Sequence, residues 1–533
     1  MRRHRHGLIA VLLTCLALTG CFSAPSRLSP FWWTGEERPL NQAYGLLLLA
    51  GNPFHPQPRT LPDEPVAHTG FNPFGINVFL EQEVEEWKRE KTLQIVTEAG
   101  FRWIRQSFPW EDIEIHGKGD FEDRRHQPYR SAWEKYDHIV GLAEKYHLDI
   151  LAILENPPAW SRAEGDAAGT YAPPDNLDDY GDYVYAVASR YRGRIRAYQV
   201  WNEPNIYPKW GERPIDPEGY TRLLCVAYRR IKEADPEAIV FAAALAQTIG
   251  YDVGPGPWTG MNEMVFLQRM YQAGAASCFD GLIVNDYILW SGPSDRRLRS
   301  WNVTFARPAY LRDIMVANGD AYKPIWLGEM NANAVPDDPS IQDWGAYGQV
   351  TLEQQARYAP LGYQRALEEW PWTGVIFFWF FKRASDAEMN QSWYYFRMAD
   401  PDFTLMPVYD TMKVYISGLT PTLYRGVHQE DDWALNYTGE WETMRDPAAV
   451  LGAYRRSGDP GAEVSFVFKG RTLTLTPGPV QGEVEVQIDD GSVRRLSLHG
   501  EPVRLFSSLR MGTHRVRVVL LGGELGIDSL SVR

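Results

Sequence analysis

The sequence is poor in cysteine and has no excess of basic residues. Its 4 cysteines in 533 residues are too few for a disulfide-built scaffold, and none form the CxxC pair typical of zinc or redox sites. The 54 Lys and Arg are outnumbered by 68 Asp and Glu, which gives a net charge of −14. Because nucleic-acid binding depends on basic surface that replaces phosphate counterions, we expect no nucleic-acid partner.

Metal-ligand patterns and membrane-spanning runs are also missing. The 11 His are scattered and form no HExxH or comparable cluster, so we expect no metal and no other cofactor. The apolar run at residues 8–18 is shorter than the about 20 residues of a transmembrane helix. Aromatic residues, in contrast, are numerous: 20 Trp, 28 Tyr and 22 Phe suit both a packed core and a site that stacks on a flat ligand.

The N-terminal residues have the pattern of an export signal. Arg2, Arg3 and Arg5 precede the apolar run, which ends in Leu18-Thr-Gly-Cys21. This ending resembles the bacterial lipobox, in which the Cys becomes the lipidated first residue. We therefore expect residues 1–20 to be a lipoprotein signal peptide and Cys21 to carry lipid, with a plain cleavage site as the alternative. The protein would be exported and lipid-anchored to the outer face of a bacterial membrane, at the cell surface or in the periplasm.

The rest of the chain divides into three zones. Residues 21–70 are rich in proline and indicate an N-terminal spacer or surface strap. Residues 71–418 alternate short β-rich runs with longer helical patterns. Residues 420–533 alternate apolar and polar positions between glycine-bearing turns, which predicts an antiparallel β-sandwich. Trp433 and Trp441 hint that this domain binds carbohydrate, and a purely structural module is the alternative.

The middle zone predicts a (β/α)8 barrel. Its strand candidates are residues 74–78, 101–106, 149–154, 198–202, 239–245, 281–285, 324–328 and 374–380, with helical patterns at 83–99, 133–146, 177–191 and 351–370, among others. Eight strand–helix units in about 350 residues match this fold. A doubly wound sheet would need a Gly-rich phosphate turn after the first strand, where the sequence is Asn77-Val-Phe-Leu80. The predicted fold class is therefore α/β, a TIM barrel followed by a C-terminal β-sandwich.

Two of the predicted strands end in a glutamate. Glu203 follows the fourth strand and Glu329 ends the seventh. A carboxylate is costly at the apolar end of a strand unless something there requires it. Two carboxylates around one barrel mouth can flank a single bond, which is the arrangement that glycoside hydrolysis needs. The alternative is that each glutamate makes a surface salt bridge in a loop.

The segment Trp201-Asn-Glu-Pro204 resembles the Asn-Glu-Pro acid/base motif of clan A glycoside hydrolases. These are barrel enzymes with catalytic glutamates after strands four and seven. The resemblance implies a retaining O-glycosyl hydrolase that acts on oligo- or polysaccharides, with Glu203 as acid/base and Glu329 as nucleophile.

Three other segments carry the resemblance across residues 74–415. Residues 101–110 are similar to the second-strand segment whose Arg supports the nucleophile, which implies that role for Arg105. Asn156-Pro-Pro-Ala-Trp-Ser161 resembles the turn after strand three in family 39-like enzymes (β-xylosidases and α-L-iduronidases), and it contains Trp160. Phe378-Trp-Phe380 resembles the eighth-strand segment whose Trp forms a sugar platform, which implies that role for Trp379. After strand six the family often has His and Tyr; this chain has Asn285-Asp-Tyr287, so Tyr287 is expected to hydrogen-bond the nucleophile.

The residue types also suit these roles without the resemblance. Asn202 could donate its amide to a sugar hydroxyl, or it could simply cap a turn. Arg105 beside a carboxylate would favour its ionised form, whereas Glu203 must hold a proton near neutral pH. Six tryptophans on or near predicted strand ends and loops are candidates for stacking on sugar faces: Trp160, Trp210, Trp258, Trp290, Trp344 and Trp379.

Alternatives remain at this point. A non-catalytic carbohydrate-binding surface lipoprotein would keep the same domains, and a transglycosylase would keep the same residues. If Glu329 is not the nucleophile, Asp286 and Glu155 are the next carboxylates. Export permits a disulfide between Cys225 and Cys278, but two separately buried thiols are the prediction. The sequence indicates no oligomeric state.

Overall fold

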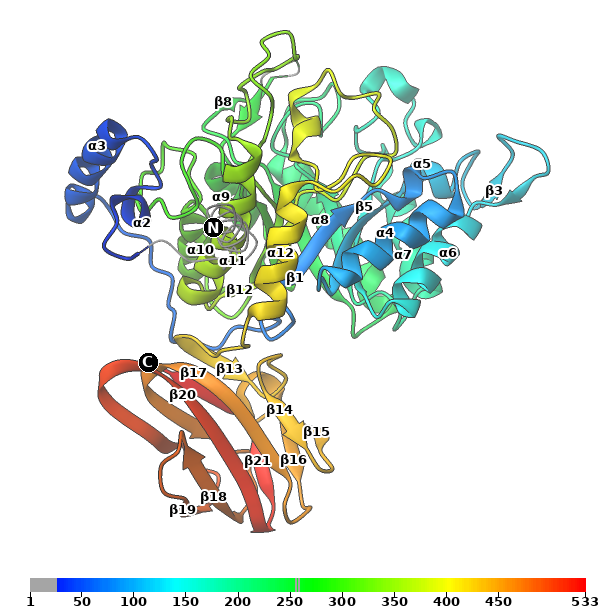
Figure 1. The fold of residues 1–533 in the computed structure, drawn as a ribbon. Helices are drawn as coiled ribbons and strands as arrows, with labels where there is room; N and C mark the ends of the chain where they lie inside the picture. Colours follow the sequence, from blue (N-terminus) through cyan, green and yellow to red (C-terminus); the bar gives the residue numbers. More distant parts are fainter. Residues whose placement is uncertain (1–25, 255, 257–258) are drawn as a thin grey trace, which may run out of the picture.

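The computed structural model describes residues 26–254, 256 and 259–533, so the predicted signal peptide, Cys21 and Trp258 lie outside the described residues. Eight parallel strands close into a barrel that is surrounded by helices, and an antiparallel β-domain follows it in sequence (Figure 1). The predicted fold class is therefore confirmed.

Each barrel strand is followed by a helix. In order around the barrel the strands are β1 (Phe74–Val78), β12 (Thr373–Phe378), β11 (Ile325–Met330), β10 (Gly281–Asn285), β7 (Ile239–Leu245), β6 (Ala197–Asn202), β5 (Asp149–Glu155) and β2 (Trp103–Pro109). In sequence order the helices are α4 (Glu86–Glu98), α6 (Glu134–Lys145), α7 (Leu177–Arg190), α8 (Pro217–Ala234), α9 (Glu263–Gln272), α10 (Pro308–Ala317), α11 (Leu352–Glu369) and α12 (Pro407–Gly418). All eight predicted strands and the four named helical patterns coincide with these elements, with ends that differ by a few residues.

Local sequence explains where these elements lie. The strands are buried along nearly their whole length, as expected for a parallel sheet between a filled interior and a ring of helices. Side chains cap the helices: Asn176, Asp216 and Thr351 accept hydrogen bonds from backbone N–H groups at the starts of α7, α8 and α11.

Shorter elements occupy the connections. They are α5 (Trp110–Ile113), the hairpin of β3 (Glu122–Asp123) and β4 (Arg130–Ser131), the hairpin of β8 (Tyr251–Asp252) and β9 (Gly260–Met261), and the 3-10 turns η1 (Asn52–Phe54), η2 (Leu80–Gln82), η3 (Ala159–Ser161), η4 (Gly165–Ala168), η5 (Ala275–Ser277), η6 (Ser392–Phe396) and η7 (Val450–Gly452).

Aromatic side chains fill the half of the barrel at the amino ends of its strands, which we call the lower end; the carboxyl ends of the strands form the upper end. Trp103, Phe241, Trp326 and Phe377 point inward and are at most 1% exposed. The rings of Phe241 and Trp326 lie 4.4 Å apart between centroids, and Phe71 lies 5.3 and 5.7 Å from Trp103 and Trp326. Phe71 comes just before β1, so it packs at the amino ends of the strands. This end of the barrel is a hydrophobic core.

The C-terminal domain consists of two antiparallel sheets around a separate apolar core. The larger sheet has seven strands: β13 (Gly426–Gln429), β22 (Ser529–Val532), β17 (Glu463–Thr476), β20 (Val503–Gly523), β18 (Gly482–Ile488) and β19 (Arg494–Leu498) in that order, with β14 (Asn436–Thr438) paired to β17. The smaller contains β15 (Glu442–Arg445), β16 (Ala453–Ser457) and β21 (Leu525–Ile527).

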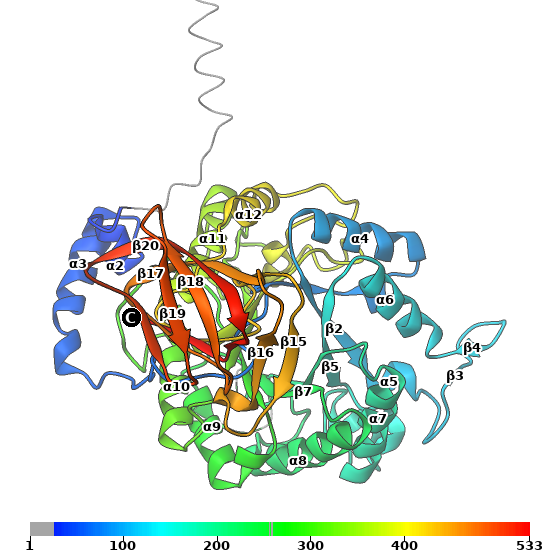
Figure 2. The same ribbon diagram turned by 90° about the horizontal axis from the view of Figure 1, so that it is seen from below.

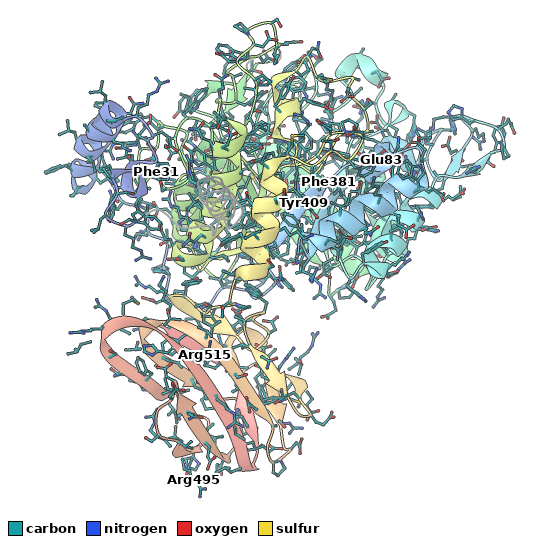
Figure 3. All side chains as sticks on the ribbon, viewed as in Figure 1. Phe31, Glu83, Phe381, Tyr409, Arg495 and Arg515 are labelled. Carbon is teal, nitrogen blue, oxygen red and sulfur yellow. A yellow bond between two sulfur atoms is a disulfide. The ribbon has the colours of Figure 1, made fainter. Side chains whose placement is uncertain are left out.

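This domain docks at the amino ends of the barrel strands, opposite the predicted site (Figures 1 and 2). Trp433 packs edge-on against Phe74 at the start of β1, and its backbone N–H donates to the Gly70 carbonyl over 2.7 Å. Trp433 therefore contributes to the domain interface. Arg495 lies at the end of the domain farthest from the barrel (Figure 3).

The proline-rich segment contains two helices, α2 (Pro30–Thr34) and α3 (Pro39–Ala50), which were not predicted as such. Both begin with proline, a residue that suits the first helical position because its fixed φ is already helical. Phe31 of α2, which is labelled in Figure 3, stacks on Tyr358 of α11 with ring centroids 5.9 Å apart. Within the described ranges, no helix has the length and apolar character needed to cross a bilayer.

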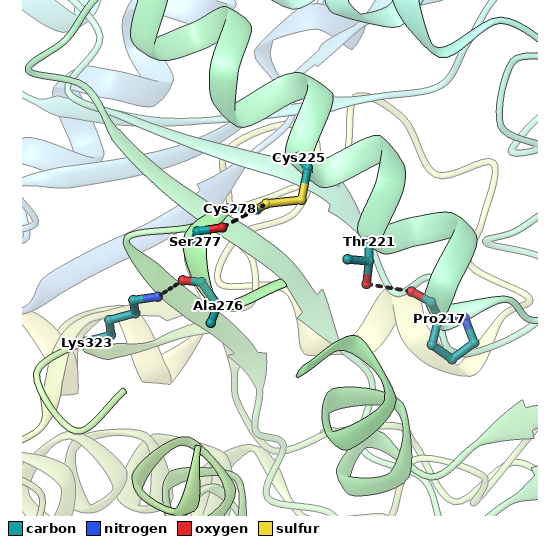
Figure 4. The surroundings of a disulfide bond; sticks show 7 residues. All are labelled: Pro217, Thr221, Cys225, Ala276, Ser277, Cys278 and Lys323. Carbon is teal, nitrogen blue, oxygen red and sulfur yellow. Dashed lines mark hydrogen bonds between the residues drawn. A yellow bond between two sulfur atoms is a disulfide. The ribbon is translucent and has the colours of Figure 1, made fainter. Parts of the chain in front are cut away.

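Cys225 and Cys278 form a disulfide (Figure 4), so the prediction of two separate thiols is wrong. Cys225 lies on α8, and Cys278 lies in the turn before β10. Their Cα atoms are 4.7 Å apart, within the range that a disulfide spans. The two residues are 53 positions apart in sequence, and only the packing of α8 beside this turn brings them together.

Candidate active site

Arg105 is the centre of a polar network at the carboxyl ends of the barrel strands. The guanidinium of Arg105 donates to Asn77 Oδ1 on β1 (2.7 Å), to Gln199 Oε1 and Asn202 Oδ1 on β6 (2.9 and 2.8 Å), and to Glu329 Oε1 on β11 (2.9 Å). Arg105 is only 2% exposed. Since arginine donates and never accepts, it fixes the orientation of all four partners.

Glu329 is buried and held from two sides. One carboxylate oxygen accepts from Arg105, and the other accepts from the hydroxyl of Tyr287. Arg105 supplies the positive charge that a buried carboxylate requires. The structure thus brings together three of the residues selected from the sequence.

Glu203 occupies a different environment. It follows β6 with a positive φ of 51°, and its carboxylate accepts from the side-chain amide of Asn285 over 2.8 Å. Burial and, next, the negative charge of Glu329 raise the pKa of Glu203 from its ordinary 4.5 to about 7. No arginine contacts Glu203 among the described residues. A carboxyl with a pKa near 7 can both give and take a proton at neutral pH.

The end of β10 serves both carboxylates. Asn285 and Tyr287 are two positions apart, so their side chains project to the same side of an extended chain. Asn285 donates to Glu203, and Tyr287 donates to Glu329. Burial and the charges of Glu329 and Glu203 raise the pKa of Tyr287 well above its ordinary value, so its hydroxyl stays a donor. Asn285 was not selected from the sequence, although it directly precedes the Asp-Tyr pair that was.

The side chain of Asn202 is bound through its oxygen. Its oxygen faces Arg105, so Nδ2 points elsewhere and has no hydrogen-bond partner in the described part of the chain. Sequence reasoning missed Asn77 and Gln199, which lie inside strands. A polar side chain in a fully buried strand is the signal that could have identified them.

The two tryptophans selected as sugar-binding residues differ in their surroundings. Trp379 directly follows β12, is half-buried, and packs edge-on against Phe79 at 5.7 Å between centroids. Trp160 packs edge-on against Trp110 at 5.4 Å and donates its indole N–H to the Glu114 carbonyl. Both lie after the carboxyl ends of strands.

The other candidate tryptophans divide into core and surface. Trp210 is 4% exposed and packs against Trp201, so it belongs to the core. Trp290 and Trp344 are 60% and 37% exposed in the loops after β10 and β11. Tyr347, near Trp344, is 36% exposed, and burial together with the charge of Glu203 raises its pKa.

Two cations lie at the same end of the barrel. Lys209 is half-buried in the turn after Glu203, with its ammonium 4.4 Å from the centre of the Tyr171 ring. Burial alone would lower the pKa of Lys209, but Tyr171 and nearby carboxylates, among them Glu203, raise it. Arg383 pairs with Glu388 at 2.8 Å, and burial lowers its pKa.

Asp286 and Glu155, the two alternatives to Glu329, are less suited to act as a nucleophile. Asp286 is fully buried, and burial raises its pKa well above its ordinary value, which disfavours the charged form that a nucleophile requires. Glu155 accepts from Ser107 over 2.9 Å, and neither Asp286 nor Glu155 contacts Arg105 within the described residues. In the same part of the chain, no group of three or more His, Cys, Asp or Glu side chains is placed to hold a metal ion.

Comparison with known proteins gives structural likeness only. No family model matches the sequence, and no curated protein is significantly similar to it. A family 39 glycoside hydrolase from the gut symbiont Bacteroides cellulosilyticus WH2 is 19% identical with a TM-score of 0.48, over 84% of this chain and 80% of its own. A monomeric β-xylosidase from Caulobacter crescentus CB15 is 15% identical with a TM-score of 0.45, over 88% and 97%.

A third solved structure, xylanase 10B from Thermotoga petrophila RKU-1, is 18% identical with a TM-score of 0.43, over 65% of this chain and 94% of its own. Likeness at this level carries no conclusion about activity. The functional argument therefore rests on the residues at the barrel end.

Proposed function

We propose that this chain is a retaining O-glycosyl hydrolase that acts on oligo- or polysaccharides, with Glu203 as general acid/base and Glu329 as nucleophile. The difference between the two carboxyl environments is the observation that carries the proposal. Glu329 is bound by Arg105 and Tyr287, whereas Glu203 has its pKa raised to about 7 by burial and by Glu329. Glycoside hydrolysis requires one carboxyl group of each kind.

The proposed reaction has two steps. Glu203 gives its proton to the glycosidic oxygen while Glu329 attacks the anomeric carbon, so the bond to the leaving group breaks and a glycosyl ester forms. Glu203, now ionised, then takes a proton from a water molecule that attacks the same carbon and releases Glu329. In this proposal the side-chain nitrogen of Asn202, whose oxygen is bound by Arg105, donates to a sugar hydroxyl near the reacting carbon.

A panel of aryl glycosides tests the assignment. We expect the chain from residue 22 onward to release the aryl group from at least one member. Glu329→Gln should release almost none, whereas Glu203→Gln should turn over slowly because it still forms the ester when the leaving group is good. Binding of sugars without turnover in the parent would support the non-catalytic lipoprotein instead. Products longer than the substrate would indicate transglycosylation.

We also propose that Cys21 carries lipid and that the protein is exported. The disulfide between Cys225 and Cys278 supports export, since such bonds persist in oxidising compartments. Cys21→Ala should abolish incorporation of labelled fatty acid into the protein and weaken its retention in the membrane fraction. Fatty-acid labelling of this variant equal to that of the parent would contradict lipidation at Cys21.

A further inference from the structure

Helix α3 exposes nearly all of its side chains although it is apolar. Its 12 residues include no charged side chain, and Gly45 is the only one that is buried. Leu40, Tyr44 and Leu47 are 85%, 62% and 74% exposed. A surface helix of a soluble protein normally turns polar residues outward, and a continuous exposed apolar patch indicates a binding surface.

The segments next to α3 in the sequence also expose apolar side chains. Leu28 before α2, Trp33 within α2 and Phe54 after α3 are 94%, 45% and 88% exposed. Both views of the ribbon show α3 projecting at one side of the barrel, beyond the ring of barrel helices (Figures 1 and 2). Among the described elements, α2 is the helix beside α3 in these views.

The body of the protein holds α3 through its inner side and its C-terminal end. A Cβ at Gly45 would lie 2.8 Å from Thr34 Cγ2, so the two helices approach closely at this glycine. Arg299 donates to the Leu48 carbonyl over 2.8 Å and to Asn52 Oδ1 over 2.6 Å. These contacts fix the helix while Leu40 and Leu47 stay exposed.

We propose that α3 is a membrane-docking helix that lies in the interfacial layer of a lipid bilayer. Such helices insert an apolar face and lie in the membrane plane. The position of α3 in the chain supports this occupant, and this step rests on the proposed lipidation of Cys21. Pro30 follows Cys21 by nine positions, which span at most about 30 Å of extended chain, so a lipid on Cys21 keeps α2 and α3 near the bilayer.

The charges beside α3 are compatible with insertion. Glu36 and Glu37, in the turn before α3, pair with Arg297 (2.7 Å) and Arg357. Docking would therefore bury no unpaired acidic group beside the helix. A second copy of the chain is the alternative occupant, and the experiment below distinguishes it from a bilayer.

Vesicle flotation tests the proposal without the lipid anchor. The chain from residue 21 with Cys21→Ser is mixed with vesicles of phosphatidylethanolamine and phosphatidylglycerol. Leu40→Gln/Leu47→Gln should lower its partition coefficient by about 10-fold or more. The matched control is Leu509→Gln, at a leucine of the C-terminal domain that is 97% exposed, and it should bind like the parent.

Two results would overturn the proposal: a parent that does not float with the vesicles, or an α3 variant that binds as well as the control. A concentration-dependent dimer that Leu40→Gln/Leu47→Gln abolishes, without vesicle binding, would assign the surface to a second copy. Because Cys21→Ser carries no lipid, these outcomes do not depend on whether Cys21 is lipidated in the cell.

Discussion

The two ends of the barrel are built from the same strands with opposite chemistry. On β2 the inward-facing Trp103 belongs to the hydrophobic core, and Arg105, two positions later on the same face, belongs to the polar network. On β6 the same change takes place between Ala197 and Gln199. Two residues of extended chain are enough to pass from aromatic core to polar network, because alternate side chains share a face.

The comparison separates stability from chemistry. The lower end buries rings against one another and against Phe71. The upper end buries Arg105 and Glu329, which costs free energy unless every charge and polar group is paired. Substitutions at the lower end should therefore reduce stability, and substitutions at the upper end should reduce activity.

The largest effect is expected from Glu329→Gln. Loss of the nucleophile should lower kcat/KM by about 10⁴-fold or more on any glycoside that the parent cleaves. Steady-state rates and the thermal midpoint should be measured together. A larger effect of Asp286→Asn on kcat/KM would mean that Asp286, and not Glu329, is the nucleophile.

Glu203→Gln should lower kcat/KM by about 10²- to 10⁴-fold and also raise stability at alkaline pH. Because the pKa of Glu203 is raised on folding from 4.5 to about 7, the folded state binds the extra proton, and stability is lost as pH rises across this range. At pH 8 the variant should be more stable by about 1–3 kcal/mol. At pH 4, where the carboxyl is protonated in both states, the two proteins should unfold alike.

Trp326→Ala tests the lower end of the barrel. Removing this fully buried ring should cost about 3–5 kcal/mol of stability while the folded protein keeps its kcat/KM within a few-fold. Trp301→Ala, at a ring that is 58% exposed, is the control and should change stability little. A large loss of kcat/KM in well-folded Trp326→Ala would mean that the two ends are not independent.

The disulfide contributes a smaller effect, again on stability. Cys225→Ser/Cys278→Ser should lower stability by about 2–4 kcal/mol, chiefly by releasing a constraint on the unfolded chain. The thermal midpoint of the parent should fall on addition of dithiothreitol, and that of the variant should not. An unchanged KM in the variant would show that the bond acts on the scaffold alone.

Much of this architecture was accessible from the sequence because its signals are local. The eight strands follow from buried apolar runs, and the position of Glu203 and Glu329 follows from strand ends. Arg105 and Tyr287 were selected by resemblance, and the structure places both against Glu329. Their catalytic roles remain predictions.

The missed features depend on contacts between distant segments. Asn285 reaches Glu203 across 82 positions, and Cys225 reaches Cys278 across 53. The helical form of residues 39–50 was hidden by the proline content around it. The local sequence around these residues does not indicate their contact partners, so only the folded structure could reveal these contacts.

The most direct test of the central claim uses azide with Glu203→Ala. On an aryl glycoside with a good leaving group, this variant should still form the ester on Glu329, and azide should then yield a glycosyl azide whose anomeric configuration, read by NMR, matches the substrate. Glu329→Gly should form no ester, and its azide product should be inverted. An inverted azide from Glu203→Ala, or full activity in the Glu329 variant, would contradict the proposed roles.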